Sequence, residues 1–403
     1  MHRLSAGLLG LGFDDSRLVT GIYRRLQLQN QPSRWAQLTF LPLEPWRAVR
    51  RCAAYVRQHH VALREVHGKG PLRQFLALIW ADLRYGVSPG PFVSCFALGM
   101  EGRRKWDGYL CTAQINTVLW PLARRSDGPL RAELGDKRTF PEWARRHGIP
   151  APALVAVFEE GRMAWRDERA LPDCDLFAKP SNHYGGHGAL CLRRTPEGWS
   201  DGHDLSCDAD GLLNLLRQRS HNRPYVLQRR LSPHPALQLF TTDAVPTVRA
   251  VTGIESDGTV RLLRASVRLP IAGSVVDNVT AGGMVAAVNL ASGQLEGGVM
   301  WRPDGMVQYA GIHPSSGAVI TGFQLPTWDA VTHLAQQAHR AAPTLPLVGW
   351  DVALTSNGPL LLEANFAFAT DIVTVPQRAP LGDSGFCGFL VRGWVGSGLK
   401  AEG

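Results

Sequence analysis

A turn flanked by two apolar runs, within Val348–Phe368 (VGWDVALTSNGPLLLEANFAF), constrains the fold more than any other part of the chain. Both runs are β-prone, and Ser356–Gly358 between them is a turn signal, so the segment predicts a β-hairpin. A three-residue loop with Gly358 in the left-handed conformation would place Thr355 opposite Pro359. This register then fixes which side chains share a face.

The predicted register brings three oxygen-bearing side chains together. Asp351 lies opposite Glu363, and Asn365 follows on the same face because side chains alternate along a strand. Two carboxylates and an amide oxygen are hard ligands that suit Mg²⁺. The alternative is a surface hairpin with two solvated acids, and the spacing does not choose between them.

Composition narrows the class of protein. The chain has 403 residues, of which 45% are hydrophobic and 19% charged, which is typical of a globular protein rather than a disordered one. Its formal net charge of +9 favours an anionic partner such as a nucleotide, an acidic metabolite, nucleic acid or a membrane surface. A positive surface without a partner is the alternative. The seven cysteines are odd in number and form no Cys-x-x-Cys pair, which favours reduced thiols over disulfides or a zinc site.

The N-terminus and the apolar runs indicate a cytoplasmic protein. The first apolar stretch is short and stops at Asp14 and Asp15, which makes a poor signal peptide. No apolar run approaches the ~18 residues expected of a membrane span. We therefore expect a cytoplasmic location and no membrane span.

Residues 1–125 are expected to form a mainly helical N-terminal region. Apolar positions recur at helical spacing in Trp46–Arg64 and in Pro71–Leu83. The basic side of the first helix could meet an anion or make peripheral contact with a membrane, although a solvated helix face is the favoured interpretation. This basic side consists of Arg47, Arg50, Arg51 and Arg57.

A second region is expected over residues 126–385, followed by a C-terminal tail at 386–403. It opens with a predicted helix over Leu130–Pro152 and continues as short β-rich segments, which we divide into subdomains at about 150–232 and 233–385. Further helices are predicted at Asp208–Gln218 and Trp328–His339. This mixture favours an α+β fold over a doubly wound parallel sheet.

A glycine-rich segment follows a predicted strand in Leu176–Leu190 (LFAKPSNHYGGHGAL). Closely spaced glycines let backbone N–H groups approach phosphate oxygens, and Lys179 before the loop can add a point charge. The segment does not match the phosphate-loop motif, and a plain hairpin turn is the alternative. The loop residues that could contact phosphate are His183, Gly185, Gly186, His187 and Gly188.

Two other segments are polar where a cleft could form. Thr247–Thr252 alternates, so Arg249 faces away from the apolar side and could bind a carboxylate or phosphate bidentately. Asp277–Gly283 (DNVTAGG) is a polar loop after a strand that contains Arg268. An ordinary exposed arginine and a plain turn are the respective alternatives.

In chain order, these segments resemble the ATP-grasp superfamily and look closest to its sugar-transfer-associated branch. The resemblance covers roughly residues 130–385, and its most specific pieces are WDVAL…GPLLLEAN, AVPTVRAVTG and DNVTAGG. It implies an ATP-grasp fold of the α+β class with an additional mainly helical N-terminal region.

The resemblance also implies which residues bind the nucleotide. Lys137 and Lys179 would hold the α- and β-phosphates of ATP, and the loop of Gly185, Gly186 and Gly188, with His183, would cover them. The backbone from Gln228 through Arg229 to Leu231 would form the hinge that hydrogen-bonds adenine.

The remaining candidates would serve the metal and the transfer step. Asp351, Glu363 and Asn365 would hold two Mg²⁺ ions, or Mn²⁺ in their place. Arg249 would stabilise the transferring phosphate, and Arg268 and Asn278 would lie near the acceptor.

The reaction implied by the resemblance is ATP-dependent ligation of a carboxylate to an amine through an acyl phosphate. The expected partners are ATP, a small molecule with a carboxylate, and an amine acceptor. Catalysis of this kind rests on positioning and on neutralising charge, which lysines, arginines and a metal site can supply. Two alternatives stay open: a phosphotransferase acting on a sugar or other hydroxyl, and a nucleotide-binding protein without catalysis. A nucleic-acid binder is disfavoured.

Overall fold

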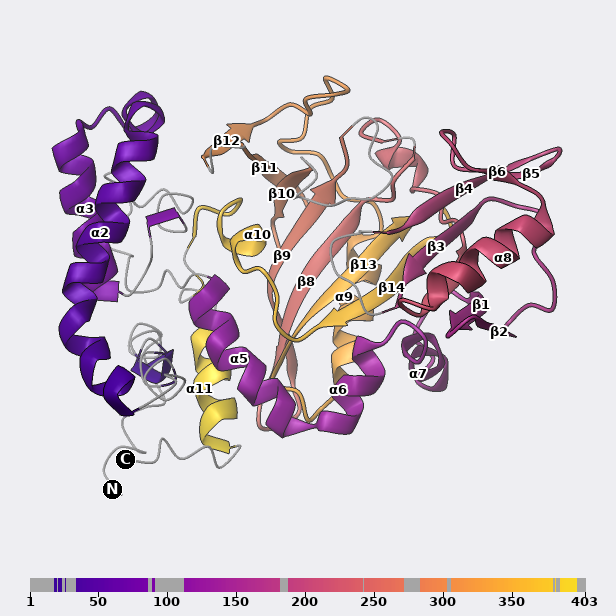
Figure 1. Cartoon of the computed structure of the whole chain (residues 1–403), viewed down its shortest axis with the longest axis horizontal. Helices are drawn as coiled ribbons and strands as arrows, with labels where there is room; N and C mark the ends of the chain where they lie inside the picture. Colours follow the sequence, from indigo (N-terminus) through magenta and orange to yellow (C-terminus); the bar gives the residue numbers. More distant parts are fainter. Residues whose placement is uncertain are drawn as a thin grey trace.

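The computed structural model consists mainly of two antiparallel sheets with covering helices, and two long helices stand at one end (Figure 1). It describes residues 18–19, 21–23, 26, 34–85, 89–90, 112–181, 188–241, 243–271, 283–302, 306–379, 381 and 385–396. The antiparallel sheets confirm the α+β expectation and exclude a doubly wound parallel sheet for the described chain.

The first sheet lies within residues 154–229. Its order is β2 (Arg162–Trp165), β1 (Leu154–Glu159), β7 (Tyr225–Arg229), β3 (Leu176–Pro180), β4 (Leu190–Thr195), β5 (Gly198–Ser200) and β6 (Ser206–Cys207). One face is covered by α8 (Ala209–Ser220), which packs Leu212 and Leu216 into the core. The helix begins after Asp208, whose side chain accepts a hydrogen bond from the backbone N–H of Gly211.

The second sheet contains the hairpin predicted from the sequence. Its order is β12 (Val307–Ala310), β11 (Leu295–Trp301), β10 (Met284–Val288), β9 (Val260–Leu269), β8 (Thr247–Ile254), β13 (Leu347–Thr355) and β14 (Gly358–Asn365). Every neighbouring pair is antiparallel. Strand β14 therefore forms an edge of the sheet, next to the helices that precede the first sheet.

Helices bury both faces of the second sheet. The amphipathic helix α9 (Trp328–Arg340) packs Val331 and Leu334 against one face. The other face is covered by α5 (Thr112–Ser126) and α11 (Phe386–Gly396). Because the central strands are buried on both faces, β13 is apolar at nearly every position and its buried polar residue Asp351 is an exception.

The prediction of a single helix over Leu130–Pro152 is wrong. Two helices are present, α6 (Gly128–Gly135) and α7 (Phe140–Arg146), and Asp136–Thr139 forms a turn between them. The Asp136 carboxylate accepts a hydrogen bond from the backbone N–H of Arg138 at 2.9 Å, which stabilises the turn instead of a continued helix. This interruption holds Lys137 beside the edge strand β14.

The two predicted N-terminal helices lie within longer ones. Helix α2 (Arg34–His67) and helix α3 (Pro71–Tyr85) are joined by a short turn at Gly68, which has a φ of 65°. They pack against each other through an apolar cluster that includes Cys52, Leu63 and Leu78. Over the described residues, no helix has the length and apolar character that crossing a membrane requires.

Candidate functional site

The hairpin of β13 and β14 confirms that Asp351 lies opposite Glu363. The predicted turn register is wrong, because Thr355 pairs with Gly358 instead of Pro359. A register shift follows between Val352 and Asp351, where Leu362 is the extra residue of a β-bulge. The tighter turn and the bulge offset each other, so the pair at the site is the predicted one.

Asp351 lies inside a buried cluster with two arginines. Its carboxylate accepts hydrogen bonds from Nε and Nη2 of Arg249, the latter at 3.1 Å, and from Nη2 of Arg268 at 2.7 Å. Asp351 is 2% exposed and Arg249 5%. Burial alone raises the pKa of the Asp351 carboxyl, but the two guanidinium groups outweigh it and hold that pKa below its usual range. The arginines come from β8 and β9, so three strands of the sheet meet at this charge cluster.

A glycine next to Asp351 makes room for this cluster. A Cβ atom on Gly349 would lie 3.0 Å from the ring of Phe368 and 3.2 Å from Cδ of Arg249. The Arg249 guanidinium in turn lies 5.8 Å from the centre of the Phe368 ring. The position of Arg249 therefore depends on a missing side chain on the neighbouring strand as well as on its ion pair.

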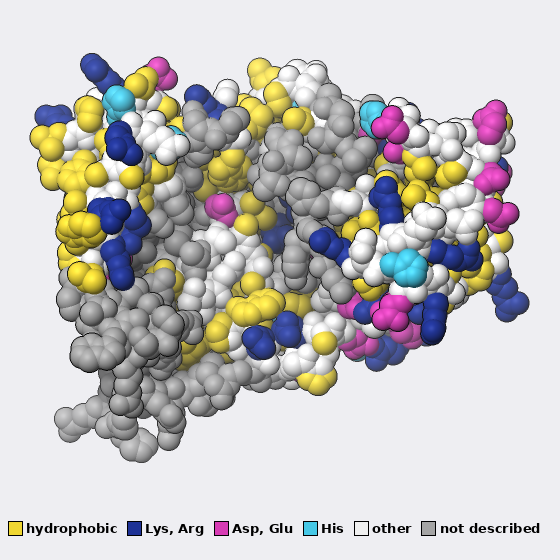
Figure 2. Space-filling view, viewed as in Figure 1, with side chains coloured by type: hydrophobic (Ala, Val, Ile, Leu, Met, Phe, Trp, Pro, Cys, Tyr) yellow, Lys and Arg dark blue, Asp and Glu magenta, His cyan; other side chains and the backbone are white. Residues whose placement is uncertain are grey.

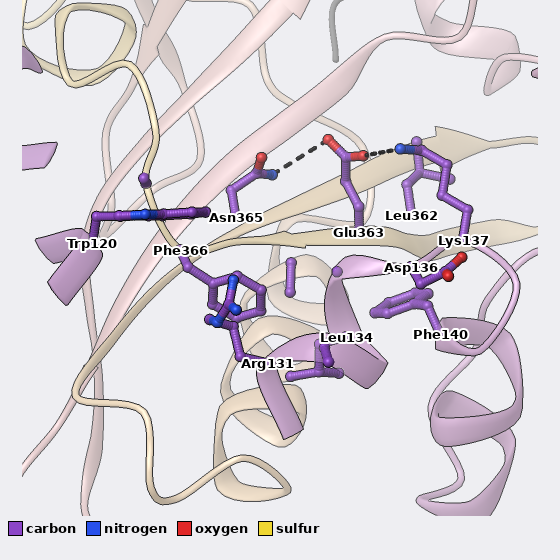
Figure 3. Close-up of a pocket in the computed structure, with 14 residues that line it drawn as sticks. Trp120, Arg131, Leu134, Asp136, Lys137, Phe140, Leu362, Glu363, Asn365 and Phe366 are labelled. Carbon is purple, nitrogen blue, oxygen red and sulfur yellow. Dashed lines mark hydrogen bonds and ion pairs between the residues drawn. The ribbon is translucent and has the colours of Figure 1, made fainter. Parts of the chain in front are cut away.

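Glu363 has a different environment from Asp351. It lies at a pocket of about 250 Å³ between β14 and helix α6, together with Lys137 and Asn365 (Figure 3). Nζ of Lys137 is 3.4 Å from Oε2 of Glu363, and Nδ2 of Asn365 is 3.4 Å from Oε1. The Glu363 side chain is 28% exposed, whereas that of Asp351 is 3% exposed. The two opposed carboxylates thus differ in their cationic partners, two arginines for Asp351 and Lys137 for Glu363, and the Glu363 side chain also helps to lower the pKa of the Asp351 carboxyl.

The donor set fits a magnesium ion only in part. Glu363 and Asn365 place carboxylate and amide groups in the same pocket, which suits a hard cation. Asp351 accepts from guanidinium groups once at Oδ1 and twice at Oδ2, so Oδ1 alone keeps a lone pair that could face a metal. Within the described residues there is no group of three or more His, Cys, Asp or Glu side chains that could hold a metal.

Two pocket residues were not predicted from the sequence. Trp120 from α5 and Arg131 from α6 line the wall next to Asn365, and the Arg131 guanidinium lies 5.2 Å from the centre of the indole ring (Figure 3). Nε of Arg131 is buried and has no hydrogen-bond partner among the described residues. Neither residue lies in a recognisable motif, and only the packing of α6 against β14 brings them to the pocket.

A buried polar network lies on the other side of β13 from Asp351. Nε2 of His339 donates to the Leu345 carbonyl at 2.7 Å, so its Nδ1 can accept from the Thr252 hydroxyl at 2.6 Å. That hydroxyl oxygen accepts from Nε1 of Trp350 at 2.9 Å. Burial lowers the pKa of His339 to about 4, and the network needs the neutral ring.

Of the candidates predicted in and around the glycine-rich loop, Lys179 and Gly188 are described by the structure. Lys179 is on β3 with its Nζ 5.9 Å from the centre of the Phe177 ring. Gly188 has a φ of 79°, and a Cβ there would lie 3.1 Å from the Tyr225 hydroxyl, so a larger residue would be strained. Among the remaining candidates, His183, Gly185, Gly186, His187 and Asn278 lie outside the described residues.

The predicted hinge is the end of β7. Gln228 is buried and donates to the Pro152 carbonyl at 3.4 Å. Arg229 pairs with Glu168 at 2.7 Å, and Leu231 follows the strand as a half-buried residue. Arg230, between them, pairs with Asp175 and Asp243, so both arginines of the predicted hinge are paired with carboxylates.

Comparisons with known proteins identify a family. The sequence model of the family described as sugar-transfer associated ATP-grasp matches residues 125–382. No curated protein matches the chain.

Solved structures with a similar arrangement are distant in sequence. D-alanyl-alanine synthetase A from Vibrio cholerae is 11% identical, with a TM-score of 0.40 over 77% of this chain and 74% of that one. The ADP complex of N5-carboxyaminoimidazole ribonucleotide synthetase is 9% identical, with a TM-score of 0.36 over 61% and 48%. An L-amino acid ligase from Bacillus licheniformis is 12% identical, with a TM-score of 0.35 over 61% and 43%. The present chain therefore spans less than half the length of the last two proteins.

The family match covers more than half of the chain and includes both sheets, Lys137 and the carboxylate hairpin. The fold is accordingly an ATP-grasp fold, preceded by the helical region that contains α2 and α3. The chain belongs to the sugar-transfer-associated ATP-grasp family.

Proposed function

We propose that this protein is an ATP-dependent ligase that joins a carboxylate to an amine through an acyl phosphate. One observation supports this most directly: in a chain of the ATP-grasp family, Lys137, Glu363 and Asn365 line a single pocket. An ammonium group next to a carboxylate and an amide offers what a metal-bound triphosphate requires, namely a cation for phosphate and oxygens for the metal. Among the described residues that line this pocket there is no Ser, Thr or Cys nucleophile.

The nucleotide would lie between the two sheets. Lys137 and Lys179 would neutralise its α- and β-phosphates, and the end of β7 would hydrogen-bond adenine through its backbone. The loop that would close over the phosphates contains His183, Gly185, Gly186 and Gly188. The hinge would consist of Gln228, Arg229 and Leu231.

Glu363 and Asn365 would hold a Mg²⁺ ion, and Asp351 would join them through Oδ1 while its pairs with the two guanidiniums stay in place. Such an ion would neutralise charge on the β- and γ-phosphates and keep the reacting oxygens in line. A second Mg²⁺, or Mn²⁺ in its place, belongs to the same proposal.

The residues of the chain would act mainly by placing charge. In the first step, an oxygen of the substrate carboxylate attacks the γ-phosphorus and ADP leaves, giving an acyl phosphate. In the second, the amine attacks the acyl carbon, inorganic phosphate leaves and the amine loses a proton. Arg249 would stabilise the transferring group, with Arg268 and Asn278 near the acceptor. Asp351 would keep both guanidiniums fixed in position, so that no reorganisation is needed during transfer.

Arg131 and Trp120 would bind the carboxylate substrate. Nε of the Arg131 guanidinium is buried with no hydrogen-bond partner among the described residues, and Arg131 lines the same pocket as Glu363. A guanidinium can bind a carboxylate bidentately, and the indole gives a flat apolar wall beside it. The substrate class we propose is therefore a small carboxylic acid.

We also propose a cytoplasmic location and the subdomain borders given by the sequence. The described cysteines Cys52, Cys174, Cys191, Cys207 and Cys387 are all free thiols, which suits a reducing compartment. The borders at about 150–232 and 233–385 follow the two sheets.

The test is a phosphate-release screen of carboxylates against amines with ATP and Mg²⁺, followed by mass analysis of the products. We expect an amide together with ADP and inorganic phosphate. Glu363→Gln should abolish the signal, and Arg162→Gln, an exposed change on the edge strand β2, should leave it intact. A phosphorylated acceptor would indicate a phosphotransferase instead, and no turnover with any pair would count against catalysis.

A further inference from the structure

Helix α3 exposes an apolar stripe along one face. Leu72 is 70% exposed, Leu76 54%, Trp80 47% and Leu83 44%. Their spacing of four, four and three residues places them on one face of the helix. The opposite face of α3 is buried against α2 through Leu78. A helix that is apolar on both faces needs a second apolar environment, and an exposed patch of this kind marks an interaction site.

Helix α2 presents a face that combines basic residues with Trp46 and Val61. Trp46 is 59% exposed, Val61 is 58% exposed, and Arg50, Arg57 and Arg64 are exposed beside them. These five residues recur at spacings of three, four and seven, which align on one side of a helix. The guanidinium of Arg50 lies 4.8 Å from the centre of the Trp46 ring. This face therefore offers positive charge and an interfacial aromatic residue together.

Positive charge is concentrated in these two helices. Residues 34–85 contain nine Lys and Arg and three Asp and Glu, which gives +6 of the net +9 of the whole chain. Figure 2 shows basic side chains next to apolar ones at the end of the molecule that α2 and α3 form, on the left. Of these arginines, Arg51 is held by Glu44 and Asp82, whereas Arg57 has no such partner among the described residues.

We propose that α2 and α3 bind the surface of membranes that contain anionic lipids. Leucine and tryptophan side chains of α3 would enter the boundary between headgroups and acyl chains, and the arginines of α2 would meet lipid phosphates. Long arginine side chains can reach headgroups while their aliphatic stems cover apolar surface. The ATP-grasp core would then work next to the membrane, where a lipid-linked or membrane-delivered substrate could be presented.

The charge distribution favours a lipid surface over other occupants. A second copy of the same face would bring two segments of +6 together, which opposes a symmetric dimer. Nucleic acid would pair with the arginines but would leave Leu72 and Leu76 in water. An anionic bilayer satisfies both the apolar stripe and the basic face.

The test is sedimentation of the full-length protein with vesicles. One set contains phosphatidylcholine with about one third phosphatidylglycerol and the other contains phosphatidylcholine alone. We expect binding to the first set only, with weakening as salt is raised. Arg50→Gln/Arg57→Gln should weaken binding on the order of 30-fold, because each basic side chain near an anionic surface contributes about fivefold. Leu72→Ser/Leu76→Ser should also weaken binding while keeping the charge.

A matched control separates this effect from a general loss of charge. Arg162→Gln/Arg166→Gln removes two exposed charges in and next to strand β2 of the first sheet and should bind as the unaltered protein does. All variants should retain the unaltered thermal unfolding midpoint, since every substituted side chain is exposed. No binding to anionic vesicles, equal binding to neutral ones, or an equal loss in the control would overturn the proposal. A stable dimer in solution that Leu72→Ser/Leu76→Ser dissociates would overturn it as well.

Discussion

The two opposed carboxylates of the hairpin should differ in how much stability is lost on neutral substitution. Asp351→Asn removes the charged carboxylate that pairs with Arg249 and Arg268, and the side chains of these arginines are only 6% and 16% exposed. Removing one partner of a buried ion pair costs about 3–5 kcal/mol. Because Arg268 is slightly exposed and also donates to Thr247 at 2.8 Å, we expect a value near the lower end, about 3 kcal/mol.

Glu363→Gln should cost far less stability. The pair of Glu363 with Lys137 is partly exposed, at 28% and 14%, and spans 3.4 Å. Pairs of this kind contribute up to about 1 kcal/mol. The glutamine keeps the shape of the side chain, so the fold should hold while phosphate binding and turnover are lost.

Thermal unfolding followed by circular dichroism measures the difference directly. For domains of this size, about 2–4 °C of unfolding midpoint corresponds to 1 kcal/mol, so Asp351→Asn should lower the midpoint by about 6–12 °C. Glu363→Gln should lower it by about 4 °C or less. Phosphate release is then compared at a temperature at which both variants are folded. The assignment of one carboxylate to the core and the other to the pocket would be refuted by an Asp351→Asn protein as stable as the unaltered one, or by a Glu363→Gln protein less stable than Asp351→Asn.

Three further predictions concern other parts of the molecule. The pKa of His339 is lowered to about 4 in the fold, so as the pH falls His339 is protonated in the unfolded chain before it is protonated in the folded one. The free energy of unfolding should therefore fall by about 2 kcal/mol from pH 7.5 to pH 5 because of this residue. Urea unfolding across this range should show a flatter pH dependence in His339→Gln, and an unchanged slope would contradict the buried neutral ring. Arg131→Gln should raise the KM for the carboxylate substrate at least tenfold with little effect on the KM for ATP, which steady-state kinetics can measure, whereas exposed Arg124→Gln on α5 should change neither. Gly253→Ala would place a Cβ 2.7 Å from the ring of Phe389 and should lower the free energy of unfolding by about 1–3 kcal/mol. A thermal unfolding midpoint equal to that of the unaltered protein would show instead that α11 can move aside.

The local elements could be predicted from the sequence because their signals are local. Apolar spacing indicated α8 and α9, and the turn signal at Ser356–Gly358 indicated the final hairpin. The break between α6 and α7 was missed because it depends on a side chain, Asp136, that bonds to the backbone of its own turn. The face that Glu363 occupies was predicted correctly, although the turn register was not, because the bulge restores the pairing.

The partners of the site residues could not be predicted in the same way. Arg249 and Asp351 are 102 positions apart, and their contact exists because β8 pairs with β13. No periodicity reports which strands become neighbours, so the sequence treats Asp351 and Glu363 as equivalent ligands. The pairing of Trp120 with Arg131 depends likewise on how two helices pack beside β14.

The strand order of the second sheet has a consequence for synthesis of the protein. Strands β8 to β12 are complete by Ala310, but β8 gains its second neighbour only when β13, which ends at Thr355, has emerged. Until then β8 is an open edge of the sheet, although seven of its eight residues are buried in the finished fold, and such an edge is a template for aggregation. Until β13 is synthesised, Arg249 on that edge also lacks its ion-pair partner Asp351. Expression at low temperature, or with chaperones that hold the nascent chain, should therefore raise the yield of soluble protein, and chains truncated before residue 347 should aggregate.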